Sequence, residues 1–198
     1  MHALKKTFVK LLPLQIKTTL LMDSYDEDKD YIRELLERFE SGVGEGAFSF
    51  FDSGELEDII YYYFSESELN KAKMAIDYAI EQFPTEISFQ VFKAQYFLNN
   101  GEPEKALARL NSLEPTDPHN PDILLTRATV FSTMNKHAEA IKEYKKAIAH
   151  IDEDLDEIHT SIAFEYQNLR DYRKAAEHLK KAILYNQSNE SLLYERGY

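Results

Sequence analysis

The feature that most constrains the fold of this 198-residue chain is a pattern of small residues that recurs about every 34 positions. One series of alanines is spaced by 34, 34 and 35 residues: Ala72, Ala106, Ala140 and Ala175. A second series precedes it in the same register, with an isoleucine in first place: Ile60, Ala94, Ala128 and Ala163. Three positions after each of these comes an aromatic residue: Tyr63, Phe97, Phe131 and Tyr166. Self-similarity of this kind indicates a repeat architecture.

Each repeat is predicted to be a pair of antiparallel helices. Apolar residues recur at spacings of three and four, which places them on one face of a helix. Alanines where the helices cross allow close approach, and the aromatic residue fills the layer toward the next repeat. The turn between the helices needs a left-handed backbone, which Gly101 and Asn135 can adopt. Ser67 is expected to cap the second helix of the first repeat, and Pro84 and Pro118 to follow the ends of the second helices of the first and second repeats.

This pattern resembles the tetratricopeptide repeat family, whose 34-residue helix–turn–helix has the same order of small, aromatic, small and proline positions. The resemblance covers residues 53–189 as four repeats: 53–86, 87–120, 121–155 and 156–189. It implies an all-α fold, a right-handed α–α superhelix (solenoid) of antiparallel helix pairs. The sequence departs from the family at the frequent tryptophan of the first helix, which is replaced by Leu56, Gln90, Leu124 and His159.

Residues 1–22 form a basic leader that carries four lysines and no acidic residue. The apolar stretch between Lys10 and Lys17 is shorter than the roughly 7–15 apolar residues of a signal peptide. It is also far shorter than the ~20 residues needed to span a membrane. Two interpretations remain: a disordered leader, or a start assigned too early, with Met22 opening the protein.

Residues 23–46 predict an amphipathic helix followed by a glycine-rich link. Acidic residues crowd the start of this helix and Gly42 is placed to end it. Its apolar residues recur at helical spacing and are the candidate cover for the first repeat: Ile32, Leu35, Leu36 and Phe39.

The last residues, 190–198, are interpreted as the start of a fifth repeat or as a short cap. Leu193 and Gly197 fall in register with His159 and Ala163 of the fourth repeat. The start of a fifth repeat would make this chain a fragment of a longer array.

The amino-acid composition excludes several kinds of functional site and binding partner. The chain has no cysteine, which excludes disulfides, thiolate metal sites and cysteine nucleophiles. Its 35 acidic residues against 23 basic ones give a formal net charge of −12. Because such a surface repels phosphate backbones, we expect no nucleic-acid partner. A neutral or basic protein is expected as partner in preference to an acidic one.

No catalytic residue, metal ligand or cofactor is predicted. The six histidines include no HExxH motif, and the chain has no glycine-rich phosphate loop. His159 and His178 could pair across a repeat, but surface positions are expected for the histidines. The sequence therefore predicts that the protein is not an enzyme.

The family resemblance implies a concave groove, lined by the first helix of each repeat, that holds a peptide or a partner protein. The groove is mostly neutral and polar, and its amides offer hydrogen-bond donors and acceptors together. Tyr61 and Phe64 are either an aromatic anchor for a partner or a surface covered by the N-terminal helix. The candidate groove residues are Tyr61, Phe64, Val91, Gln95, Asn99, Leu125, Thr129, Phe164, Gln167 and Asn168.

Some family members clamp a C-terminal carboxylate of a chaperone with basic side chains on the first helices. No basic residue occupies the matching positions here, which are Glu57, Tyr61, Phe92, Asp122 and Thr126. We therefore expect no chaperone-tail clamp.

The sequence thus predicts a non-catalytic scaffold or adaptor in the cytoplasm, with a membrane role not expected. Two alternatives remain open. The repeats could regulate an effector domain beyond residue 198, or they could belong to an envelope assembly that the leader tethers.

Overall fold

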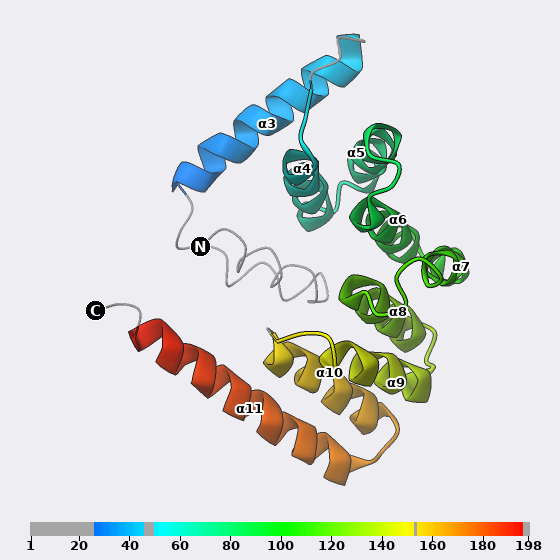
Figure 1. Cartoon of the computed structure of the whole chain (residues 1–198), viewed down its shortest axis with the longest axis vertical. Coiled ribbons are helices and arrows are strands. Elements are labelled where there is room, and N and C mark those ends of the chain that lie inside the picture. Colours follow the sequence, from blue (N-terminus) through cyan, green and yellow to red (C-terminus); the bar gives the residue numbers. More distant parts are fainter. Residues whose placement is uncertain (1–25, 46–49, 153, 196–198) are drawn as a thin grey trace. The chain divides into compact units, whose positions relative to one another are not determined.

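The structure is a computed structural model that describes residues 26–45, 50–152 and 154–195. These residues form an all-α helical repeat of the solenoid type, with nine helices and no strand (Figure 1). The chain divides into two compact units, with the boundary in the sequence between Gly101 and Glu102, and each is described by itself. The basic leader predicted at 1–22 lies outside the described residues.

The first unit holds four helices. They are α3 (Asp26–Glu45), α4 (Ser53–Ser65), α5 (Leu69–Gln82) and α6 (Ile87–Asn99). Helices α4 and α5 form the predicted first repeat, and α6 opens the second. A reciprocal cap fixes the start of α4: the Asp52 carboxylate accepts from Glu55 N at 2.8 Å, and the Glu55 carboxylate accepts from Asp52 N at 3.0 Å.

Helix α3 continues through Gly42 to Glu45, so the prediction that Gly42 ends it is wrong. A glycine inside a helix costs only about 1 kcal/mol relative to alanine. The helix also gains from packing, because Leu35 and Phe39 are buried at 2% and 1% exposure. A glycine ends a helix where its backbone turns left-handed, and Gly42 stays helical.

Helix α3 covers the first repeat, as expected from its apolar face. The Phe39 ring lies 5.7 Å from Phe51 and 5.8 Å from Tyr78, centroid to centroid. The Tyr63 hydroxyl donates a hydrogen bond to Glu40 Oε1 at 3.0 Å. The cover therefore rests on the buried Tyr63, which points into the repeat core as predicted.

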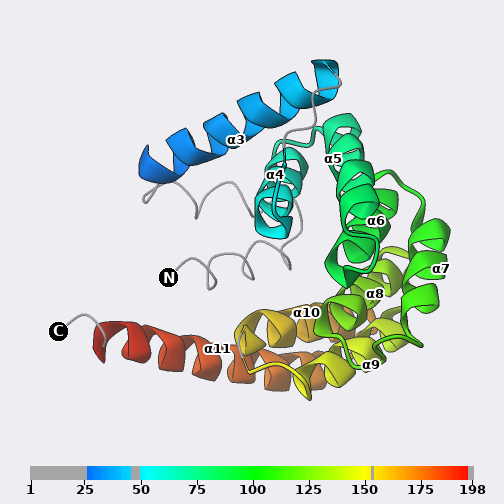
Figure 2. The ribbon, with the colours of Figure 1, turned by 45° about the horizontal axis from the view of Figure 1, so that its top comes forward.

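The second unit holds five helices. They are α7 (Pro103–Leu113), α8 (Pro121–Thr133), α9 (His137–Ile148), α10 (Leu155–Asn168) and α11 (Tyr172–Glu195). Helices α8 and α9 form the predicted third repeat, and α10 packs against both α9 and α11 (Figures 1 and 2). The helix pairs in substantial contact, among the described residues, are all neighbours along the chain.

Helix α11 runs without a break past residue 189, where the predicted fourth repeat ends. Neither proline nor glycine occurs between Asp171 and Arg196, so nothing in the local sequence stops the helix. The segment interpreted as the start of a fifth repeat is therefore, up to Glu195, the end of α11. Gly197 lies outside the described residues.

The alanines of the repeat pattern are all buried, with exposures of 0–2%. A methyl side chain is small enough to let two helix backbones approach closely, whereas a larger side chain at the same place would force them apart. These residues are Ala72, Ala94, Ala106, Ala128, Ala140, Ala163 and Ala175.

The turns between paired helices share one left-handed residue at the repeat spacing. Its φ angle is 59° at Ser67, 75° at Gly101, 57° at Asn135 and 59° at Arg170. After three of these residues, the next amide donates to the carbonyl of an aromatic residue: Tyr63 at 2.8 Å, Phe131 at 2.8 Å and Tyr166 at 2.9 Å.

The predictions for Gly101 and Asn135 are thus confirmed, whereas the predicted capping role of Ser67 is wrong. Helix α5 begins after Glu68 without a side-chain cap. Ser67 takes the left-handed position of the turn instead.

We expect Arg170→Gly to stabilise the protein. A left-handed backbone costs a residue with a side chain roughly 1–2 kcal/mol, and glycine gives back part of this in chain entropy. The free energy of unfolding, from urea denaturation followed by circular dichroism, should rise by about 0.5–1 kcal/mol.

Gly101→Ala is the matched control. An added methyl group at Gly101 meets nothing within 4 Å, so only the backbone strain at φ 75° remains. This variant should lose about 1 kcal/mol. A loss of stability in Arg170→Gly would contradict the assignment of its turn.

Candidate functional site

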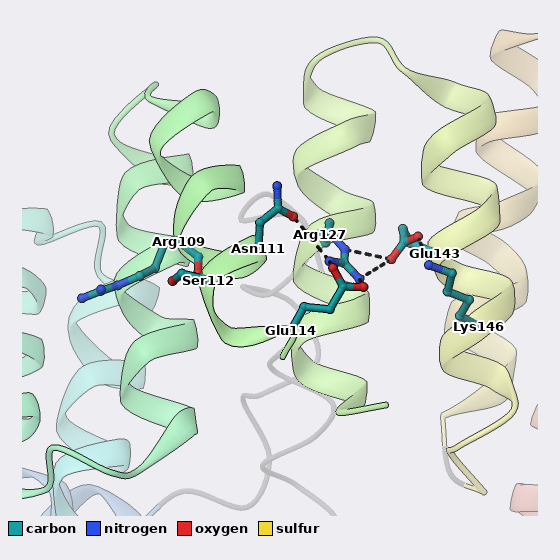
Figure 3. Close-up of polar contacts among 7 residues, drawn as sticks. All are labelled: Arg109, Asn111, Ser112, Glu114, Arg127, Glu143 and Lys146. Carbon is teal, nitrogen blue, oxygen red and sulfur yellow. Dashed lines mark hydrogen bonds and ion pairs between the residues drawn. The ribbon is translucent and has the colours of Figure 1, made fainter. Parts of the chain in front are cut away.

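The guanidinium of Arg127 is a deeply buried charge of the second unit, with a side chain that is 4% exposed. It lies between two carboxylates (Figure 3). Its Nε and Nη2 are 2.8 Å from Glu143 Oε2, and its Nη1 is 2.9 Å from Glu114 Oε2. Lys146 Nζ donates to the other oxygen of Glu143 at 2.6 Å.

This cluster is balanced in charge, with two cations and two carboxylates. Glu114 directly follows α7 and the other members come from α8 and α9, so the cluster joins the second repeat to the third. Hydrogen bonding to Arg127 lowers the pKa of Glu114 below its ordinary value. The sequence pattern of alanines did not predict this cluster, because Glu114 and Glu143 lie 13 and 16 residues from Arg127 and not at the repeat spacing. We assign it a structural role.

A pair of histidines joins α10 to α11. His159 Nδ1 lies 3.0 Å from His178 Nδ1, and Tyr185 stacks on His159 with centroids 5.5 Å apart. Burial lowers the pKa of both rings, aided for His178 by His159, and brings the pKa of His178 to about 4. His159 is only 5% exposed, so the expected surface position is wrong for this residue. The cause is that α10 and α11 pack through this face.

Glu157, at the start of α10, has the largest upward shift of any described carboxyl group. Burial, with the nearby charges of Asp154 and Asp156, raises its pKa to about 8.

No group of three or more potential ligands that could hold a metal ion occurs in the described part of the chain. Among those same residues, no helix is long and apolar enough to cross a membrane.

In the first unit, much of the predicted groove is covered. Tyr61 is half-buried, with its ring edge-to-face on Phe92 at 4.9 Å. Phe64 is 5% exposed and Val91 is 3% exposed, so neither presents its side chain to a partner. Both rings of the aromatic pair contact Phe92 of α6. Gln95 is half-buried and Asn99 is exposed.

In the second unit, the predicted groove residues on α8 are less exposed than those near the end of α10. Leu125 is 6% exposed and Thr129 donates a hydrogen bond to Leu125 O at 3.1 Å, so the middle of α8 is closed. Near the end of α10, Phe164 is 54% exposed. Gln167 and Asn168 are exposed beside it. These three residues form what we call the α10 face.

A buried carboxylate fixes the α10 face. Glu165 is 4% exposed. It accepts a hydrogen bond from Ser132 Oγ on α8 at 2.5 Å and lies 2.7 Å from His137 Nδ1 on α9. Because Glu165 follows Phe164 directly, these contacts fix the backbone that presents Phe164 to solvent.

Comparisons with known proteins agree with this architecture. Residues 121–149 and 156–189 match the model of the tetratricopeptide repeat family. These matches fall within the third and fourth predicted repeats. A search of the curated proteins finds no sequence that matches this chain.

Solved structures share the fold. TTC0263, a thermophilic TPR protein of Thermus thermophilus, superposes with a TM-score of 0.62 at 17% identity, over 83% of this chain and 88% of that one. A crystal structure of MamA gives 0.59 at 17% identity, over 87% and 99%. MamA from Desulfovibrio magneticus RS-1 gives 0.54 at 15% identity, over 80% and 97%.

Residues 121–149 and 156–189 are therefore assigned as tetratricopeptide repeats, and the chain shares its fold with TPR proteins of known structure. This family builds protein-interaction scaffolds from stacked helix pairs.

We expect Arg127→Ala to destabilise the protein by about 3–5 kcal/mol, because it leaves the buried Glu143 without its main cation. The control is Lys146→Ala: this side chain is 42% exposed, and its loss should cost less than about 1 kcal/mol. Urea denaturation at pH 7 measures both. Equal effects would show that the Arg127 contacts are not the basis of the cluster.

Acidification should also weaken the fold through the histidine pair. The folded-state pKa of His178, about 4, lies below the unfolded value of 6.5. Its contribution is therefore complete above pH 6.5 and is lost as the pH falls toward 4. His178→Asn should flatten this part of the curve of melting temperature against pH. If the slope between pH 6.5 and 4 is unchanged, the neutral buried pair is refuted.

Proposed function

We propose that this protein is a non-catalytic scaffold that binds a segment of another protein on the α10 face. The observation that carries the proposal is the exposed ring of Phe164. Most large apolar side chains on the first helices are buried in the repeat core, whereas this one is 54% exposed. An aromatic residue with amides beside it suits a partner that offers both apolar surface and backbone hydrogen bonds.

The positioning of this face supports its role in recognition. Glu165 ties α10 to α8 and α9 through Ser132 and His137, so the face is held by buried polar contacts. A rigid surface loses little conformational entropy when a partner binds. The contacts of Glu165 hold the backbone that presents Phe164, and they therefore favour a binding role for this ring over a purely structural one.

Phe164→Ala should remove binding without loss of stability, since the ring is more than half exposed. The tagged protein would be purified from its native cell and its bound proteins identified by quantitative mass spectrometry. Proteins specific to the wild type should be lost from Phe164→Ala and depleted by Asn168→Ala.

The matched control is Met74→Ala on α5, which changes a side chain of similar exposure, 47%, on a second helix. It should retain the wild-type partners, and all variants should melt within a few degrees of the wild type. Retention of the same partners by Phe164→Ala would show that the α10 face is not the binding surface.

A further inference from the structure

Helix α11 has an apolar strip whose counterpart on α9 is covered by a helix. The two are second helices of successive repeats, related by a shift of 35 residues that brings Ala140 onto Ala175. On α9, Ile141, Tyr144 and Ile148 pack in one apolar cluster with Ile158 and Ile162 of α10. The structure thus shows which kind of element fits this face of a second helix.

The equivalent strip on α11 is open. Ile141 and Ile148 correspond to Ala176 and Ile183, which are both exposed, and Ile183 is 56% exposed. Tyr144 corresponds to the half-buried Leu179. At the start of the strip, Tyr172 is 67% exposed. These four residues lie at helical spacings of four, three and four, so they share one side of α11. We call them the α11 strip.

The two helices of the covered pair differ in net charge. Helix α10, which covers α9, carries three acidic residues and no lysine or arginine: Asp156, Glu157 and Glu165. Helix α9 carries three lysines and two glutamates, and one of the lysines contacts the covering helix directly. Lys145 Nζ donates a hydrogen bond to Tyr166 Oη of α10 at 2.9 Å.

The α11 strip is bordered by basic residues, as α9 is. Between Tyr172 and Asn186 there are four basic residues and one acidic residue, in a chain whose net charge is −12. Lys180 occupies the position equivalent to Lys145, and with Arg173 it borders the strip on the side away from Ala175. Lys180 forms no ion pair with any described residue.

We propose that the α11 strip binds an acidic amphipathic helix of another protein, in the way that α9 holds α10. Its apolar residues, spaced as Ile158 and Ile162 are, would pack on Leu179 and Ile183. Its carboxylates would lie beside Lys180 and Arg173. A symmetric contact between two copies of α11 is disfavoured, because it would bring the same basic residues together.

The probe is a fluorescent peptide with the sequence of α10, Leu155–Asn168. A staple between positions 160 and 164 keeps it helical, and fluorescence anisotropy against the full chain measures its affinity. The peptide should bind the wild type, more weakly as salt is raised. Ile183→Ser should weaken binding about tenfold or more, and Lys180→Glu should weaken it several-fold.

The matched control is Lys181→Glu, which makes the same change of charge on the other side of α11 and should leave the affinity unchanged. Absence of binding, or equal binding to Ile183→Ser, would overturn the proposal. Equal binding would mean that the peptide takes the place of α10 on α9.

Two further measurements test other occupants. Analytical ultracentrifugation should show a monomer whose state Ile183→Ser does not change. Vesicles of phosphatidylglycerol should not sediment the protein through this strip. Dimerisation or vesicle binding that Ile183→Ser abolishes would overturn the proposal in favour of a second copy or a lipid surface.

Discussion

Close contact between helices at buried alanines is the constraint on which the rest of the structure depends. Where Ala128 and Ala140 lie fully buried in α8 and α9, the two backbones can approach until neighbouring side chains interlock. The same condition recurs in every repeat, because each has an alanine at the corresponding position of its second helix. Aromatic residues can then fill the space between layers, and polar residues are left for the outer surfaces.

The features that the sequence predicts well are those encoded within one repeat. Alanine spacing defines the helix pairs, and Gly101 and Asn135 mark their turns, because both signals act over a few residues. Arg170 holds the same left-handed position without being a residue that favours it. Its conformation is imposed by the helices on either side, and only the 35-residue register from Asn135 could have revealed it.

Interactions between repeats could not be predicted in the same way. Arg127 and Glu143 are 16 residues apart on different helices, and Ser132 and Glu165 are 33 apart. Each residue alone is typical of a solvated helix surface, and the three-dimensional packing brings the pairs together. For the same reason, the sequence could not show which of the predicted groove residues are exposed. Helical register placed Val91 and Phe164 on the first helices, but the neighbouring helices decide that Val91 is buried and Phe164 is exposed.

Within each unit, the pairing of helices that are neighbours along the chain has a consequence for how the protein forms. Contacts between residues close in sequence require little loop closure, so helical arrays of this type fold quickly. During synthesis, α8 and α9 can pair before α10 has left the ribosome, and each new helix then meets a surface that already exists. The order of the repeats in the sequence is therefore also an order of assembly in time.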